Sequence, residues 1–75
     1  MEPYKNIAGS SGVRAYEIGP DFITIEFSDG SVYRYTYASA GQENVERMKG
    51  FAQAGQGLNT FMNTALSKLY ERKER

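Results

Sequence analysis

The stretch FITIEFSDGSVYRYTY, residues 22–37, decides the fold of this chain because it reads as two strands joined by a tight turn. In the first strand Ile23, Ile25 and Phe27 alternate with polar residues, so one face is apolar and the other is polar. The second strand carries a tyrosine at every second position, and the Asp-Gly pair between the strands is typical of a hairpin turn. The stretch therefore predicts a β-hairpin.

The length of the turn decides which residues of the hairpin face each other. A two-residue turn would place Arg34 opposite Ile25, in the middle of the apolar face. A three-residue loop over residues 28–30, with Gly30 in the left-handed conformation as a bulge, places Tyr33 opposite Ile25 instead. The apolar residues then share one face, so we expect the bulged register.

Length and composition restrict the chain to one small folded domain. At 75 residues it is too short for two independent cores, and its apolar content of 40% argues against disorder. The absence of cysteine and histidine excludes disulfides, thiolate nucleophiles and imidazole acid/base chemistry. Nine basic residues balance nine acidic ones, so no net charge attracts the chain to a polyanion. Without a signal-peptide pattern or a membrane-length apolar run, we expect a soluble, cytoplasmic protein with no membrane contact.

One strand is predicted before the hairpin. Residues 1–12 are polar and rich in glycine, and we expect them to form a flexible lead-in. Residues 13–18 then predict a strand, although its apolar side chains are divided between the two faces. Gly19-Pro20-Asp21 ends this strand, because proline has no N–H to donate to a sheet.

Two helices are predicted after the hairpin. The first is expected to begin at Ser39 as N-cap, with Gln42 completing a capping box, and to end at Gly55-Gln56-Gly57. Its apolar stripe consists of Val45, Met48, Phe51 and Ala52. The second is expected to begin at Leu58 and to be the main core helix, with a basic end that suits the helix dipole. Its apolar residues at helical spacing are Leu58, Phe61, Met62, Ala65, Leu66, Leu69 and Tyr70.

The predicted order is strand, strand, strand, helix, helix, which defines an α+β fold class. A three-stranded antiparallel meander, with two C-terminal helices packed on one face, is the simplest arrangement with short connections. Residues 13–75 would then form a single domain.

Four short motifs give the chain a resemblance to the KTSC domain, a small bacterial domain named for the C-terminus of lysyl-tRNA synthetase. Their order and spacing over about residues 10–71 carry the likeness. The motifs are Ser10-Ser11, Ile18-Gly19-x-Asp21, Phe27-x-x-Gly30-x-x-Tyr33-x-Tyr35 and Gly57-Leu58-Asn59-Thr60-Phe61.

The chain departs from many members of this family in two places. Where they carry a Val-Pro pair and an aromatic residue in the first helix, this chain has Ala38-Ser39 and Val45. Where they carry Tyr-Phe-Asn before the last helix, it has Gly57-Leu58-Asn59. The family has no established activity, and its fusion to lysyl-tRNA synthetase suggests a role with RNA. The resemblance thus implies RNA as a candidate partner and no reaction.

Tyr33, Arg34 and Tyr35 are the first candidate binding residues, because aromatic side chains on a sheet can stack on bases and arginine can pair with phosphate. In the bulged register, however, both tyrosines face the core helices and Arg34 points away from them. The favoured interpretation is therefore two core tyrosines with hydroxyls at the rim. Arg34 would then pair with Glu26 or with solvent.

The basic C-terminal residues Lys68, Arg72, Lys73 and Arg75 are the second candidate, as contacts to a phosphate backbone. A solvated helix end that matches the dipole explains them equally well. The glycines of residues 55–57 precede a helix N-terminus, which can bind an anion, but a turn between two helices is the simpler interpretation.

No catalytic, metal-binding or cofactor-binding residue is expected, because no serine has a histidine to activate it and no carboxylate pair falls on one face of one element. The sequence predicts a non-enzymatic binding or adaptor module with RNA as its first candidate partner. The alternative is a protein partner, including a second copy bound through the sheet.

Overall fold

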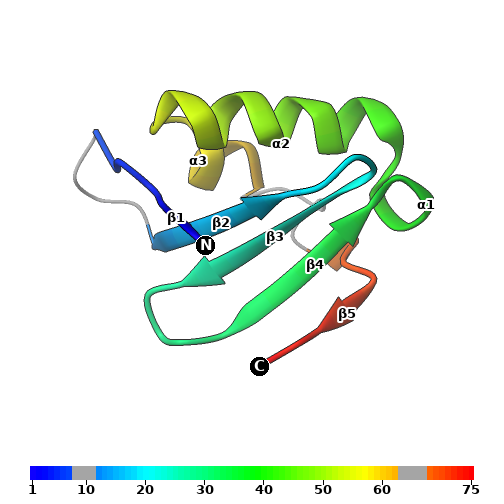
Figure 1. Ribbon diagram of the computed structural model, residues 1–75, viewed down its shortest axis with the longest axis horizontal. Coiled ribbons are helices and arrows are strands. Elements are labelled where there is room, and N and C mark those ends of the chain that lie inside the picture. The colour runs from blue at the N-terminus through cyan, green and yellow to red at the C-terminus, as the bar shows by residue number, and fades with distance from the viewer. Residues whose placement is uncertain (8–11, 63–67) are drawn as a thin grey trace.

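The computed structural model describes residues 1–7, 12–62 and 68–75. Helices lie on one side of an antiparallel sheet whose described strands follow the order β1-β2-β3-β4-β5 (Figure 1). The elements are β1 (Glu2–Pro3), β2 (Val13–Ile18), β3 (Phe22–Phe27), β4 (Val32–Thr36), α1 (Tyr37–Ala40), α2 (Gln42–Ala54), α3 (Leu58–Met62) and β5 (Arg72–Lys73). The predicted α+β meander is confirmed as the centre of this sheet, with a short strand added at each edge.

The hairpin between β3 and β4 has the bulged register that its sequence predicts. Ile25 lies opposite Tyr33, and the Phe27 N–H donates to the Ser31 carbonyl oxygen over 2.8 Å. Gly30 has a φ of +91°, which places it in the left-handed region. Asp29 accepts hydrogen bonds from the Ser31 hydroxyl at 2.6 Å and from the Ser31 N–H at 2.9 Å, and both lower the pKa of its carboxyl. The loop is therefore fixed by its own side chains.

A matched pair of glycine substitutions tests this turn. Gly30→Ala should lower the free energy of unfolding by about 1–2 kcal/mol, since alanine is strained at a positive φ. Gly50→Ala should instead raise it by about 1 kcal/mol, because glycine is a poor residue in a helix interior. A Cβ on Gly50 meets no heavy atom of the described residues within 4 Å. Urea unfolding measures both values, and equal changes of one sign would contradict the turn assignment.

A β-bulge in β2 settles which side chains of this strand face the helices. The register between β2 and β3 shifts between Val13 and Ala15. Val13 therefore lies opposite Phe27 while Tyr16 lies opposite Ile25, so both face the helices. The division of apolar residues between two faces in the sequence is the signature of this bulge.

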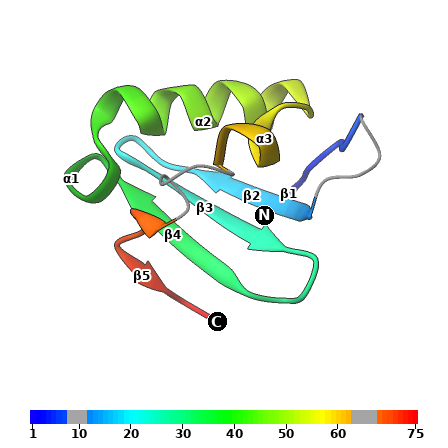
Figure 2. The same ribbon diagram turned by 180° about the vertical axis from the view of Figure 1, so that it is seen from behind.

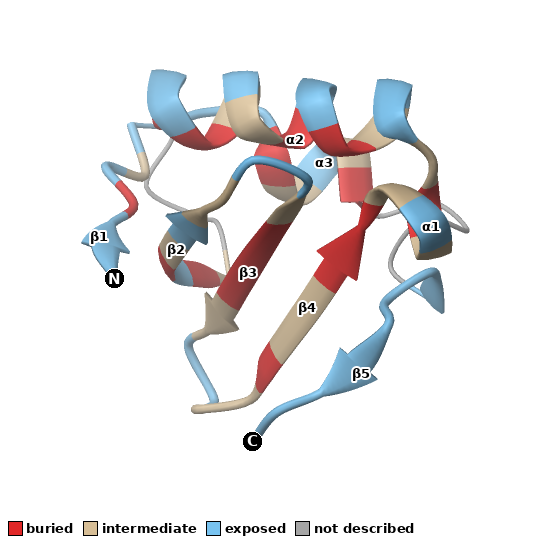
Figure 3. Cartoon of the chain, turned by 45° about the vertical axis from the view of Figure 1, so that its right-hand side comes forward, coloured by how far each residue is buried: buried red, intermediate tan, exposed pale blue. Residues whose placement is uncertain are grey.

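The core lies between the sheet and the helices, where buried segments of β3, β4 and α2 face one another (Figure 3). The apolar stripe predicted for the first helix is buried in α2, with Val45 and Met48 fully enclosed. Ile23 and Ile25 meet it from β3. α3 lies beside α2 and closes the core with Leu58 (Figure 2).

The helical half begins earlier than the sequence predicts. Thr36, and not Ser39, is the N-cap, because its hydroxyl accepts from the Ser39 N–H and the Ser39 hydroxyl accepts from the Thr36 N–H, each over 3.0 Å. This reciprocal pair is a capping box. α1 ends at Gly41, whose φ of +94° breaks the helix before α2. The predicted partner, Gln42, is the first residue of α2.

The prediction for the C-terminal segment is wrong beyond residue 67. α3 covers Leu58–Met62, residues 63–67 lie outside the described part, and the basic end is strand β5 on the edge of β4 rather than the end of a helix. β4 would otherwise leave its outer backbone groups without a strand partner. Pairing with β5 satisfies these groups, while helical spacing in the sequence carries no information about a free strand edge.

The N-terminal residues add a contact that the sequence pattern did not predict. Glu2–Pro3 pairs with β2, and Tyr4 is buried among the core side chains. The Tyr4 hydroxyl accepts a hydrogen bond from the Leu58 N–H at the start of α3, over 3.3 Å. Tyr4 therefore stabilises the beginning of this helix.

Candidate binding surface on the sheet

The sheet face that points away from α2 is the candidate binding surface, and we call it the outer face. Alternation along each strand and the registers between the strands assign its residues, because side chains opposite each other share a face. They are Ala15, Glu17, Phe22, Thr24, Glu26, Val32, Arg34, Thr36 and Arg72. α2 and α3 lie on the other side of the sheet, and α1 lies at the end of β4 (Figures 1 and 2).

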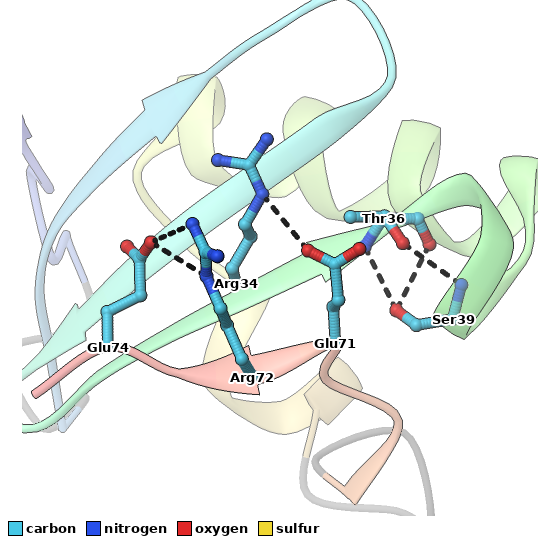
Figure 4. A network of polar contacts seen from close by, with 6 residues as sticks. All are labelled: Arg34, Thr36, Ser39, Glu71, Arg72 and Glu74. Atoms are coloured by element: carbon cyan, nitrogen blue, oxygen red, sulfur yellow. Dashed lines mark hydrogen bonds and ion pairs between the residues drawn. The ribbon is translucent and has the colours of Figure 1, made fainter.

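Arg34 lies at the centre of the outer face. Its guanidinium carbon lies 3.8 Å from the centroid of the Phe22 ring, which is the geometry of a cation–π contact. Its Nε lies 3.4 Å from Glu71 Oε1, and Figure 4 shows these two side chains pointing toward one another. The aromatic ring and the carboxylate together hold the guanidinium against the sheet.

Gly19 permits the position of the Phe22 ring. A Cβ at residue 19 would lie 1.8 Å from Phe22 Cε1, far inside van der Waals contact. The Gly19 N–H also donates to the Phe22 carbonyl oxygen over 3.0 Å, which closes the turn between β2 and β3. The glycine therefore supports Arg34 indirectly, through the ring on which the guanidinium lies.

Ion pairs offset most of the positive charge of the outer face. Glu26 Oε2 accepts a hydrogen bond from Arg75 Nη2 over 2.9 Å and lies 3.6 Å from Arg14 Nη1. Arg72 Nη2 lies 3.1 Å from Glu74 Oε2. The expected pairing of Arg34 with Glu26 is wrong, since β5 brings Glu71 closer to Arg34 and Arg75 to Glu26. Each pair is at least partly exposed, so its contribution to stability is small.

The residues predicted as a binding site fall on two sides of the sheet. Tyr35 belongs to the core cluster, and Tyr33 packs against it from the helix side. The Lys73 ammonium lies 5.7 Å from the centroid of the Tyr33 ring, also on the helix side. Arg34 and Arg72 lie on the outer face, opposite each other, and Lys68 is an exposed residue that precedes β5. These six residues therefore do not form one surface.

Tyrosine rings gather where β5 joins the sheet. The Tyr70 ring lies 4.7 Å from the Tyr33 ring and 6.3 Å from the Tyr35 ring between centroids. Phe27 meets Tyr33 edge to face at 5.7 Å. Burial raises the pKa of the Tyr35 hydroxyl, and the neighbouring Tyr33 and Tyr70 raise it further. The cluster thus favours the neutral, protonated form of Tyr35.

The raised pKa of Tyr35 predicts a loss of stability in alkali. Unfolded tyrosine ionises near pH 10, whereas folded Tyr35 keeps its proton, so the unfolded state binds fewer protons above that pH. The contribution of Tyr35 is therefore complete below about pH 10 and is lost as the pH rises toward the folded pKa. Urea unfolding from about pH 8 to about pH 11 should show a shallower decline for Tyr35→Phe than for the natural chain. Tyr16→Phe is the control, and an equal decline in all three proteins would contradict the prediction.

Phe22, Glu71 and Glu74 contribute to this surface although no motif in the sequence singles them out. The alternation of β3 does place Phe22 on the same face as Arg34, which is a signal for its role. The two glutamates carry no such signal, because the apolar spacing of the C-terminal segment predicts a helix. Their roles follow only from the pairing of β5 with β4.

The described residues form neither a metal site nor a membrane span. They contain no group of three or more acidic side chains arranged to hold a metal ion. No helix among them is long and apolar enough to cross a membrane. Gly55, with a φ of +78°, ends α2 by donating to the carbonyl oxygens of Phe51 and Ala52, so residues 55–57 form a turn between helices.

No protein-family model, curated protein or solved structure matches this chain. The fold and the outer face are therefore the basis for a functional assignment.

Proposed function

We propose that this chain is a non-catalytic binding module whose partner is a protein docked on the outer face. The observation that carries this proposal is the mixed charge of that face, where each of four arginines lies within 3.6 Å of one of three glutamates. The arginines are Arg14, Arg34, Arg72 and Arg75. A protein surface presents both signs of charge and complements such a face, whereas a polyanion presents only one.

The ion pairs of the outer face suit exchange with a partner. The side chains of Arg72 and Arg75 are 63% and 68% exposed. Solvent therefore screens the two charges of each ion pair, and their attraction is weak. A partner that offers its own carboxylates and cations can replace them at little cost. The guanidinium of Arg34, already held by Phe22 and Glu71, supplies an ordered anchor of the kind enriched in interfaces.

We also propose a protein family and a cellular location for this chain. The motifs that resemble the KTSC domain support membership of that family, since Gly19, Gly30 and Gly57 all fall in tight turns next to strands or helices. Ser10-Ser11 lies outside the described residues. A cytoplasmic setting agrees with the lack of cysteine.

RNA is the second candidate partner, because a guanidinium that lies flat on an aromatic ring offers its plane to a base. RNA binding would weaken with salt as counterions are released, and Arg34→Ala would reduce the slope. A titration with a random-sequence RNA pool at low salt tests this candidate. No binding by the folded protein would remove it.

Capture from cell lysate, with and without nuclease, tests the proposed protein partner. The immobilised chain should retain a protein after nuclease treatment, and Arg34→Ala should lose it. Arg47→Ala is the matched control, since this arginine lies on α2 with its side chain 61% exposed. Retention that disappears with nuclease, or equal retention by both variants, would overturn the proposal.

A further inference from the structure

The edge of β4 is filled by the chain's own C-terminal segment through backbone hydrogen bonds. Glu71 and Glu74 donate their N–H groups to the carbonyl oxygens of Arg34 and Val32, over 2.6 and 2.7 Å. The Val32 N–H donates in return to the Arg75 carbonyl oxygen over 2.8 Å. These bonds require an extended segment antiparallel to β4 and depend little on its side chains.

The segment that fills this edge is held weakly by its side chains. Residues 68–75 are all exposed, including Leu69 and Tyr70 at 39% each. Figure 3 shows β5 as an exposed strand at the margin of the sheet, beside the half-buried middle of β4. Because no residue of this segment is fully buried, an edge strand of this kind opens more readily than the central strands and leaves a template for another strand.

We propose, building on the protein-binding role above, that the β4 edge is a docking site for an extended segment of a partner protein, and that residues 70–75 occupy it in the partner's absence. The binding mode is strand addition, in which main-chain hydrogen bonds supply affinity and side chains supply specificity. The C-terminal segment competes with the partner for the same backbone groups.

The contacts of the segment define the side chains that a partner needs. Tyr70 packs its ring on Tyr33, so the partner begins with an aromatic residue. Glu71 meets Arg34 at 3.4 Å, so an acidic residue follows. Arg75 meets Glu26 at 2.9 Å, so a basic residue follows four positions after the acid. The antiparallel direction fixes this order, which is aromatic, acidic, three variable residues, basic.

Binding of a labelled peptide to the full chain tests this inference. The probe is a fluorescent peptide with the sequence LYERKER of residues 69–75, followed by anisotropy. Glu74→Pro removes the shorter of the two N–H bonds to the Val32 carbonyl oxygen, 2.7 Å against 3.3 Å for Arg75, and should release the internal segment. This variant should therefore bind the peptide about tenfold more tightly than the natural chain, or more. Equal affinity of the two proteins would overturn the inference.

Two controls separate strand addition from general attraction. Lys73→Pro should bind as weakly as the natural chain. Lys73 lies opposite Tyr33, and the bond from Glu74 to Val32 makes this a non-hydrogen-bonded pair, whose N–H groups point away from the neighbouring strand. A peptide with the residues of Glu71 and Arg75 exchanged has the same composition and should bind Glu74→Pro about tenfold more weakly. Equal binding of both peptides would also overturn the inference. Tyr70→Ala, at an exposed position, provides a second route to loosen the segment if Glu74→Pro does not fold.

The peptide measurement and the capture experiment fail independently. If Glu74→Pro does not bind the peptide but Arg34→Ala still fails to retain a protein, the inference of strand addition is contradicted. The proposed protein-binding function is then still supported. If the peptide binds as expected but no protein is retained from lysate, the edge is a strand-docking site and the proposed use of the outer face falls.

Discussion

Ile25→Ala is expected to lower the free energy of unfolding by about 2–5 kcal/mol, because it removes a buried aliphatic side chain and leaves a cavity. Ile25 has no exposed surface, and it lies opposite Tyr33 under the helices. A domain of this length has a total stability of roughly 4–11 kcal/mol, so the variant should lose a large share of it. Urea unfolding followed by circular dichroism measures the change.

Ile7→Ala is the matched control for this substitution. Ile7 is 62% exposed, so the same truncation should change the free energy of unfolding by less than about 0.5 kcal/mol. A loss below about 1 kcal/mol for Ile25→Ala would contradict its place in the core, since buried isoleucine truncations cost more than this.

Gly19→Ala is expected to destabilise the domain by about 1–3 kcal/mol, since the added methyl group overlaps the Phe22 ring. The displaced ring can no longer support the guanidinium of Arg34. The effect of Gly19→Ala should therefore be smaller in a chain that already carries Arg34→Ala, which a double-mutant cycle measures.

Gly12→Ala is the control for the glycine substitution. A Cβ on Gly12 meets no heavy atom of the described residues within 4 Å, so its effect should be within about 0.5 kcal/mol. Strict additivity of Gly19→Ala and Arg34→Ala would contradict the coupling through Phe22.

The central hairpin and the apolar face of α2 could be predicted from the sequence because local rules determine them. Alternation fixed the faces of β3, and a conflict between Arg34 and Ile25 selected the bulged register that the structure has. Helical spacing placed Val45 and Met48 in the core. In each case the decisive residues are close together in the chain.

The first helix start and the C-terminal strand could not be predicted in the same way. Thr36 and Ser39 both suit a capping position, and only the end of β4 decides which of them begins the helix. The pairing of β5 with β4 joins residues about forty positions apart and depends on a free sheet edge. The apolar spacing through Leu69 and Tyr70 predicts a helix, because spacing along the sequence contains no information about a free sheet edge elsewhere in the fold.

The candidate site was only partly predictable for the same reason. The sequence places Arg34 on the face opposite the tyrosines, which the structure bears out. Its partner Glu71, and the link from Arg75 to Glu26, depend on the position of β5. Arg34, Arg72 and Arg75 therefore become members of ion pairs in the fold, which changes the favoured partner from RNA to protein.

Site-specific photo-crosslinking tests the protein-binding role of the outer face most directly. A photoreactive phenylalanine analogue placed at Glu17, an exposed residue opposite Thr24 on this face, should form adducts with a protein in cells that persist after nuclease treatment. The same analogue at Glu43, exposed on α2 away from the sheet, should form none. Adducts that nuclease removes, or equal adducts from both positions, would contradict a protein partner on the outer face.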